Sequence, residues 1–247
     1  MSTPAILSAT ALYKNYGALT VTDNVDFSLP PGARHALIGP NGAGKSTLIN
    51  LLTGKLKPSS GRIFLRGAEI TGMPPETRAR RGIVRTFQIN TLFPKLTPME
   101  TVALAIAQRR GEGGSLLAPM SRRRETLAEA VDLLKQFDLA ADAGRQTREL
   151  PYGKQRLLEI ATAFAMKPQV LLLDEPAAGI PAKESGDVFS VIAALPREVA
   201  ILFIEHDMEL VFKFAERIHV LVAGRIVASG DPATIAADPT VRAVYLG

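Results

Sequence analysis

Residues Gly39 to Thr47 read GPNGAGKST, a glycine-rich run closed by a lysine and two hydroxyl residues. The run fits G-x-x-x-x-G-K-[ST], in which glycines let the backbone curl so that successive N–H groups point at phosphates. We expect Lys45 to reach the β- and γ-phosphates of ATP and Ser46 to offer its hydroxyl to Mg²⁺. The predicted nucleotide-binding residues of this loop are Gly39, Asn41, Gly42, Ala43, Gly44, Lys45, Ser46 and Thr47.

The alternative reading of this loop is an ordinary glycine turn with a chance lysine. Its context favours the phosphate site, because Arg34 to Ile38 precedes it as a short apolar strand and Lys45 to Thr53 follows as a helix ending at Gly54. The positive N-terminal end of such a helix attracts anions. Strand, loop and helix together predict nucleotide binding.

An acidic pair forms the second candidate site. Val170 to Leu173 is typical of a buried strand, and Asp174 and Glu175 follow it directly. Ligands of parallel α/β sheets sit at the carboxyl ends of strands, so Asp174 can hold Mg²⁺ and Glu175 can act as general base for an attacking water. Alone, the pair could be a solvated strand end; beside the phosphate loop it predicts ATP hydrolysis.

Strand and helix patterns alternate along most of the chain, which indicates an α/β fold. We predict a P-loop NTPase core with a mostly parallel sheet, an N-terminal antiparallel β subdomain and an inserted α-helical lobe. The whole chain, 1–247, is predicted as one domain, with the core at 1–88 and 157–247 and the lobe at about 89–156.

Composition excludes several classes of protein. The 247 residues include no cysteine, so disulfides, zinc–thiolate sites and thiol catalysis are ruled out. The net charge of +5 suits phosphate ligands or a membrane surface. No apolar run approaches the roughly 18 residues of a membrane span, and the first residues lack a signal-peptide pattern. We therefore expect a soluble, cytoplasmic protein that meets a membrane only through a partner.

Leu150 to Arg156 reads LPYGKQR, at the start of a predicted helix and shortly before the acidic strand. This segment resembles the LSGGQ signature of ABC-type ATPases. Other positions match the same family: Tyr16 stands at the aromatic that stacks on adenine, Gln88 at the Q-loop glutamine and His206 at the switch histidine. The resemblance covers the whole chain.

The resemblance implies a role for each matching residue. Glu175 and His206 would be catalytic, and Gln88 would contact the γ-phosphate and help Ser46 and Asp174 hold Mg²⁺. The remaining nucleotide-binding positions implied by the family are Tyr16, Gln88, Tyr152 and Gly153. Tyr13 is the competing aromatic for adenine, although its place in a strand pattern favours packing.

A narrower likeness is carried by short motifs spread along the chain. RTFQ before the insert, DEPAAG at the acidic pair, EHDM at the histidine and the final YLG look like the ATPase subunits of branched-chain amino acid importers, the LivG type. That family implies a second ABC ATPase subunit facing the first head to tail, with each ATP between one phosphate loop and the other signature. It also implies a transmembrane permease, a periplasmic binding protein and a peripheral place on the cytoplasmic face of the inner membrane.

Three residues depart from the family pattern. Pro151 replaces the signature serine, Lys154 replaces a glutamine, and Pro181 stands where the D-loop usually has Asp or Asn. We interpret Pro151 as the first helical residue, a position that tolerates proline. The main hypothesis is the ATPase of an importer of amino acids or a related small polar solute. The departures keep open a second hypothesis, that the chain is a weakly hydrolysing half of a heterodimeric motor. A non-transport ABC ATPase is the third reading, although the single cassette and short insert argue against it.

Arginines and two histidines complete the candidates. Runs of arginine without interleaved aromatics predict solvated faces or partner contacts rather than nucleic-acid binding. His35 and His219 fall inside strand patterns and are interpreted as structural. The arginines concerned are Arg78, Arg80, Arg81, Arg85 and Arg122 to Arg124.

Overall fold

The computed structural model describes residues 4–86, 92–112 and 124–246, and the chain divides into two compact units. The core unit contains Met1–Arg85, Gln169–Glu175 and Leu195–Gly247, and the helical unit contains Thr86–Pro168 and Pro176–Ala194. The lobe predicted at about 89–156 falls within the helical unit, which also takes in residues 157–168 and 176–194. The exact bounds of the lobe and core stay a prediction.

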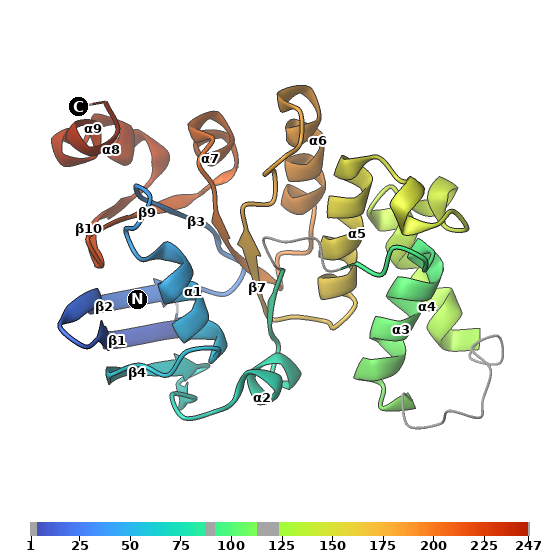
Figure 1. Ribbon diagram of the computed structural model, residues 1–247, viewed down its shortest axis with the longest axis horizontal. Helices are drawn as coiled ribbons and strands as arrows, with labels where there is room; N and C mark the ends of the chain where they lie inside the picture. Colours follow the sequence, from blue (N-terminus) through green and yellow to red (C-terminus); the bar gives the residue numbers. More distant parts are fainter. Residues whose placement is uncertain (1–3, 87–91, 113–123, 247) are drawn as a thin grey trace. The chain divides into compact units, whose positions relative to one another are not determined.

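Two sheets build the core unit (Figure 1). Among the described residues, the antiparallel sheet has the order β2-β1-β4-β5 and the larger sheet the order β10-β9-β3-β8-β7-β6. In the larger sheet β10 pairs antiparallel with β9, and the other neighbours are parallel. This confirms the predicted α/β class. The strands are β1 (Leu7–Tyr16), β2 (Leu19–Leu29), β3 (Arg34–Ile38), β4 (Ser60–Leu65), β5 (Ala68–Glu69), β6 (Ile83–Arg85), β7 (Val170–Asp174), β8 (Ala200–Ile204), β9 (Arg217–Val222) and β10 (Arg225–Gly230).

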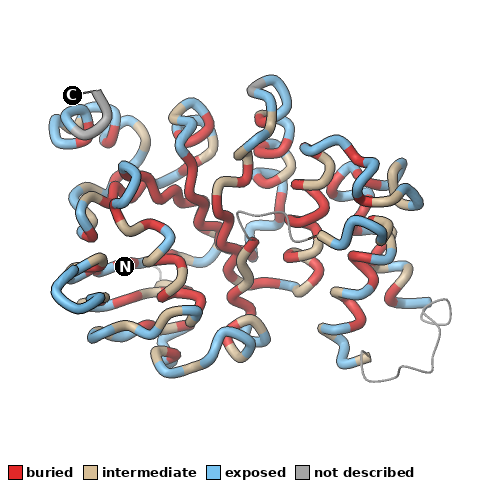
Figure 2. Tube along the Cα trace, in the orientation of Figure 1, coloured by how far each residue is buried: buried red, intermediate tan, exposed pale blue. Residues whose placement is uncertain are grey.

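The centre of the larger sheet is buried and mostly apolar. Every residue of β3, β7 and β8 is buried, as the unbroken red of the central strands in Figure 2 shows. A parallel sheet covered on both faces needs continuous apolar strands rather than alternating ones. This is why VLLLD and AILFI could be recognised as buried strands in the sequence.

Register brings three strand ends to one level. Asp174 of β7 pairs with Ile204 of β8, and Ile204 pairs with Leu37 of β3. The phosphate loop follows β3, His206 follows β8 and Glu175 follows β7, so all three leave the sheet at the same carboxyl edge. This is the edge at which α/β sheets bind ligands.

The helices of the core unit begin and end at recognisable residues. The phosphate-loop helix ends as predicted at Gly54, whose φ of 79° is left-handed and whose N–H donates to the carbonyl of Leu51. Asp207 accepts hydrogen bonds from the first turn of the helix that follows His206. The helices are α1 (Lys45–Thr53), α2 (Pro75–Arg80), α7 (Met208–Phe214), α8 (Pro232–Ala237) and α9 (Pro239–Leu246).

The helical unit packs its helices around a small aromatic and apolar core. Thr97 and Glu100 form a capping box at the start of its first helix, and Phe137 meets Phe164 at 5.7 Å between ring centroids. Its elements are α3 (Pro98–Arg109), α4 (Arg124–Gln136), α5 (Tyr152–Phe164), α6 (Ala182–Ala193) and the 3₁₀ turns η3 (Ala140–Asp142) and η4 (Thr147–Glu149). In the described part of the chain, no helix is long and apolar enough to cross a membrane.

Arg78 corrects the interpretation of the arginines as solvated or partner-facing. Its side chain is 1% exposed, and its guanidinium donates to the carbonyls of Leu51 and Leu52 at 2.8 Å each. It also donates to the carbonyls of Thr71 and Met73. Five fixed N–H donors suit a site of several carbonyls, so Arg78 satisfies backbone groups left over at the end of α1.

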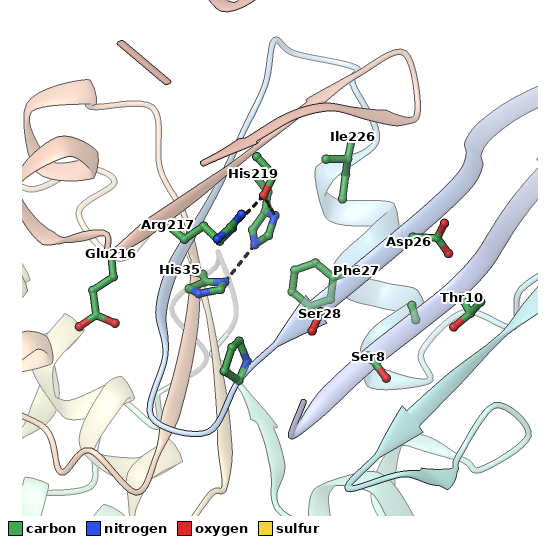
Figure 3. Close-up of a pocket in the computed structure, with 13 residues that line it drawn as sticks. Ser8, Thr10, Asp26, Phe27, Ser28, His35, Glu216, Arg217, His219 and Ile226 are labelled. Carbon is green, nitrogen blue, oxygen red and sulfur yellow. Dashed lines mark hydrogen bonds between the residues drawn. The ribbon is translucent and has the colours of Figure 1, made fainter. Parts of the chain in front are cut away.

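Two buried histidines join β3 to β9 beside a cavity of about 650 Å³ (Figure 3). His35 Nδ1 lies 3.0 Å from His219 Nε2, and His219 Nδ1 lies 2.9 Å from Ser229 Oγ. Burial lowers the pKa of His35 to about 4, with the charge of Arg217 adding to the effect. Burial likewise lowers the pKa of His219 to about 3, helped by His35 and Arg217. Since only one proton fits between the facing nitrogens, the geometry excludes protonation of both rings, and burial disfavours charge on either of them.

Acid should therefore destabilise the core unit through this pair. Both folded-state pKa values lie below the ordinary value of about 6.5, so the contribution to stability is complete above about pH 6.5 and is lost as the pH falls toward about 4. Near pH 5 each histidine should add up to about 1.4 kcal/mol per pH unit to the slope of the unfolding free energy. Urea unfolding between about pH 7 and pH 5 measures this slope.

Replacing His219→Gln should flatten the slope, because the variant lacks one of the two groups that bind protons only in the unfolded chain. Equal slopes for His219→Gln and the unaltered chain would contradict the assignment.

Candidate active site

The phosphate loop runs from the end of β3 into α1. Gly44 is the N-cap of α1, and no described side chain caps the first turn of that helix. The N–H groups of the turn can therefore meet an external acceptor, and the positive end of the helix favours an anion. Asn41, Gly42 and Ser46 are exposed and Thr47 is half-buried, so the outer surface of the loop is accessible to a ligand.

Two glycines of the loop are required by close backbone packing. A Cβ atom on Gly39 would lie 2.1 Å from the carbonyl oxygen of Leu221, and one on Gly44 would lie 2.6 Å from that of Val21. Gly44 also has a φ of 102°, which L side chains rarely adopt. Any other residue at either position would displace the loop from β2 or β9.

Lys45 is held by its own loop. Its side chain is buried, and Nζ donates to the carbonyls of Gly39 at 2.6 Å and Pro40 at 3.0 Å. Burial lowers the pKa of Lys45, while the charges of Glu175 and Asp174 act in the opposite direction. These contacts place a cation at the mouth of the loop, close to the acidic pair.

Glu175 and His206, predicted as the catalytic pair, are in contact. His206 Nε2 lies 2.7 Å from Glu175 Oε1, and the imidazole is about half exposed whereas the carboxylate is mostly buried. When Glu175 is ionised it can only accept, so Nε2 of His206 must carry the proton of this hydrogen bond. Glu175 has a φ of 48°, in the left-handed region that non-glycine residues rarely occupy. Such strain is often found at functional sites.

Asp174, predicted as a metal ligand, is paired with an arginine that the sequence interpretation had set aside. Arg85 Nη2 donates to Asp174 Oδ2 at 2.6 Å, and Arg85 Nη1 donates to Asn50 Oδ1 at 2.6 Å. Asp174 is buried and Arg85 is mostly buried, with side chains 3% and 12% exposed. Arg85 is therefore not on a solvated face. The sequence could have indicated a place at the site, because Arg85 ends a strand and a charge at the carboxyl edge of a parallel sheet faces the ligand.

Tyr16, predicted to stack on adenine, lies at the end of β1 with 49% of its surface exposed. The ammonium of Lys14 lies 5.0 Å from the centre of its ring. Tyr13 is half-buried. An exposed ring has a free face for a planar ligand, whereas a packed one does not, which favours Tyr16 over Tyr13.

The signature segment lies in the helical unit, at the start of α5. Tyr152 is 43% exposed and its ring packs on Gly179 of the D-loop, where a Cβ atom would come within 3.1 Å of the ring. Lys154, one of the departures from the family, donates to both the carboxylate and the carbonyl of Asp138. Its charge is thus engaged within the helical unit.

Both proline departures occupy N-cap positions. Pro151 precedes α5 and Pro181 precedes α6, and neither provides a side-chain hydrogen bond to its helix. This corrects the interpretation of Pro151 as the first helical residue. Serine and asparagine are preferred N-caps because their side chains accept from the first turn. The departures therefore remove a cap as well as a polar side chain.

The predicted residues divide among the described parts of the chain. The phosphate loop, Tyr16, Asp174, Glu175 and His206 belong to the core unit, and Tyr152 and Gly153 belong to the helical unit. Gln88, predicted to contact the γ-phosphate and Mg²⁺, lies outside the described residues.

Comparison with known proteins agrees with the geometry. The family model described as ABC transporter matches residues 22–178, and the model described as branched-chain amino acid ATP-binding cassette transporter matches residues 225–247. The chain is 42% identical over 254 residues to the high-affinity branched-chain amino acid transport ATP-binding protein LivG of Escherichia coli, covering 100% of this chain and 99% of LivG. It is 41% identical over 256 residues to BraF of Pseudomonas aeruginosa, with the same coverage.

Solved structures agree on the fold. The ADP conformation of MJ1267, an ATP-binding cassette of an ABC transporter, superposes with a TM-score of 0.86 at 30% identity, covering 99% of this chain and 100% of that one. A nucleotide-free cassette from an ABC transporter gives a TM-score of 0.86 at 29% identity, covering 98% of this chain and 99% of the other. These likenesses extend over the core unit and the helical unit alike, and with the family models they show that the chain belongs to the ABC transporter family.

Proposed function

We propose that this chain is the ATP-hydrolysing subunit of an importer for branched-chain amino acids or a related small polar solute. The observation that carries the proposal is the contact between Glu175 and His206 at the carboxyl edge that also carries the phosphate loop. The names of LivG and BraF, and the model matching residues 225–247, support the class of cargo.

Binding of ATP is assigned to the core unit. The uncapped first turn of α1 would receive the phosphates, with Lys45 exchanging the carbonyls of its own loop for phosphate oxygens. Tyr16 would stack on the adenine. The ADP conformation of MJ1267, a cassette of the same fold, supports nucleotide binding.

Mg²⁺ fits the donors that the site presents. The exposed hydroxyl of Ser46 and the buried carboxylate of Asp174 are hard oxygen ligands, which Mg²⁺ prefers. Gln88 is proposed as a further ligand from its motif position. When bound, the ion neutralises charge that develops on the β- and γ-phosphate oxygens.

Hydrolysis is assigned to Glu175 and His206. Glu175 would act as the general base that removes a proton from the attacking water. His206 would hold the carboxylate in place by donating from Nε2, and its exposed side allows it to meet the γ-phosphate as well.

The other half of each site would come from a second subunit, either another copy of this chain or a homologue. Exposed Tyr152 and the adjacent backbone N–H groups at the start of α5 would approach the phosphates bound by the partner. Closure of two subunits on ATP would drive a transmembrane permease fed by a periplasmic binding protein. The chain would then sit on the cytoplasmic face of the inner membrane.

Lys45→Ala should weaken ATP binding by at least about 100-fold, because two charge-assisted hydrogen bonds worth roughly 1.5–3 kcal/mol each would be lost. Titration calorimetry measures the affinity. Lys154→Ala is the matched control, since it removes the same charge from the helical unit. Near-native affinity in Lys45→Ala would exclude the phosphate-loop assignment.

Glu175→Gln should keep ATP affinity within about twofold and reduce turnover by about 100-fold or more, because the amide keeps the shape and loses the base. The variant should accumulate as an ATP-bound dimer on a sizing column. Unchanged turnover would place the base elsewhere, with His206 the next candidate.

Homodimers of this chain should hydrolyse ATP slowly, and Pro151→Ser should raise turnover at saturating ATP about tenfold. One hydrogen bond to a charged phosphate is worth roughly 1.5–3 kcal/mol when it is felt in the transition state. Pro151→Gly is the matched control, because glycine caps a helix almost as well as serine but supplies no hydroxyl.

The comparison of these two variants also tests the second candidate function, a weakly hydrolysing half of a heterodimeric motor. That candidate is favoured by the absence of polar side chains at Pro151 and Pro181. If serine and glycine raise turnover equally, helix capping is the cause. If neither raises it, the proline is neutral and the homodimer is fully competent.

A further inference from the structure

Arg85 links three elements of the core unit, namely β6, α1 and β7. The guanidinium of Arg85 reaches Asn50 on α1 with one nitrogen and Asp174 on β7 with another, each at 2.6 Å. Its planar fork suits two acceptors at once, which a lysine could not serve in the same way. Arg85 therefore contacts residues of the site, although the sequence alone assigned no role there to the first residue of RTFQ.

The position of Arg85 along the chain is equally specific. Arg85 is the last residue of β6 and the last of the core unit before the chain enters the helical unit at Thr86. Asp174 ends β7, and the chain leaves the core unit again after Glu175. The ion pair thus joins the two strand ends at which the chain passes from one unit to the other.

The charge on Asp174 requires a positive partner. Its side chain is 3% exposed, and a buried carboxylate without a counter-charge is costly. Arg85 meets that requirement through a direct hydrogen bond to Oδ2. A divalent cation at Asp174 would meet it too, but would then lie within a few ångströms of the guanidinium, where like charges repel.

We propose that Arg85 is a positioning residue that competes with the divalent cation for the Asp174 carboxylate and so sets the cation concentration at which the nucleotide site is loaded. The inference rests on the proposed function, since it takes Asp174 as the ligand of the nucleotide's Mg²⁺. It predicts that Arg85 weakens cation binding, whereas a residue that only orients Asp174 for the metal would strengthen it.

The experiment uses the full-length chain with a fluorescent ADP analogue, so that no hydrolysis intervenes. Mg²⁺ is titrated at a fixed analogue concentration, and the midpoint is compared between the unaltered chain, Arg85→Met and Arg85→Lys. Arg85→Met should lower the Mg²⁺ midpoint about tenfold, the size of one charge-assisted contact. Arg85→Lys keeps the charge and should stay closer to the original midpoint.

Thermal unfolding separates competition from a merely structural role. Without Mg²⁺, Arg85→Met should unfold at a temperature lower by about 5 °C or more, because Asp174 loses the cation that is hydrogen-bonded to its carboxylate. With Mg²⁺ and ADP most of that loss should disappear. An equal loss in both conditions would show that the ion pair only stabilises the fold and would overturn the proposal.

Arg225→Gln is the matched control. It removes one arginine from an ion pair with Asp23 elsewhere in the core unit, and it should leave the Mg²⁺ midpoint unchanged. An unchanged or raised midpoint in Arg85→Met would also overturn the proposal.

Failure of the proposed function would give a different experimental result. In that case the unaltered chain itself would show no Mg²⁺-dependent binding of the ADP analogue. If the unaltered chain binds normally and only the Arg85→Met shift is missing, the competition is disproved and the nucleotide site stands.

Discussion

The site depends on the register of three buried parallel strands. Because β3, β8 and β7 are buried along their length, the polar side chains of the candidate site lie where these strands end. The pairing of Asp174 with Ile204 and of Ile204 with Leu37 sets those ends level. A shift of one residue in either pairing would turn side chains to opposite faces and separate Glu175 from His206.

The charged residues at this edge are paired with one another, and a ligand could take the place of one partner in each pair. Lys45 is bound by carbonyls of its own loop, Asp174 by Arg85, and Glu175 by His206. Each contact resembles one that a nucleotide or its cation would make. In some a cation lies against oxygen acceptors, and in others a carboxylate lies beside a hydrogen-bond donor. Binding then replaces interactions instead of creating charge in a buried place, which keeps the desolvation cost low.

The helical unit contributes chemistry of a different kind. Its proposed functional surface is the start of α5, where the ring of Tyr152 packs on Gly179 and the N-cap residue makes no side-chain hydrogen bond to the first turn. Proline at the N-caps of α5 and α6 leaves the N–H groups of their first turns without a capping side chain. The positive end of the α5 helix is retained without a serine hydroxyl, so under the proposed function the departures would affect the contribution to a partner's site and not the residues of the core unit.

The sequence by itself determined the local features. The glycine and lysine pattern, the apolar strand before Asp174 and the helix ending at Gly54 are each encoded within a few residues, so periodicity and turn chemistry sufficed to predict the α/β class and the motifs. Tertiary structure decided what depends on residues far apart in the chain. The burial of Arg78, the pairing of Arg85 with Asp174 across 89 positions and the facing of His35 with His219 follow from strand order and packing. The sequence does not show whether an arginine is hydrated at the surface or paired with a buried carboxylate, because the fold brings the partner to it.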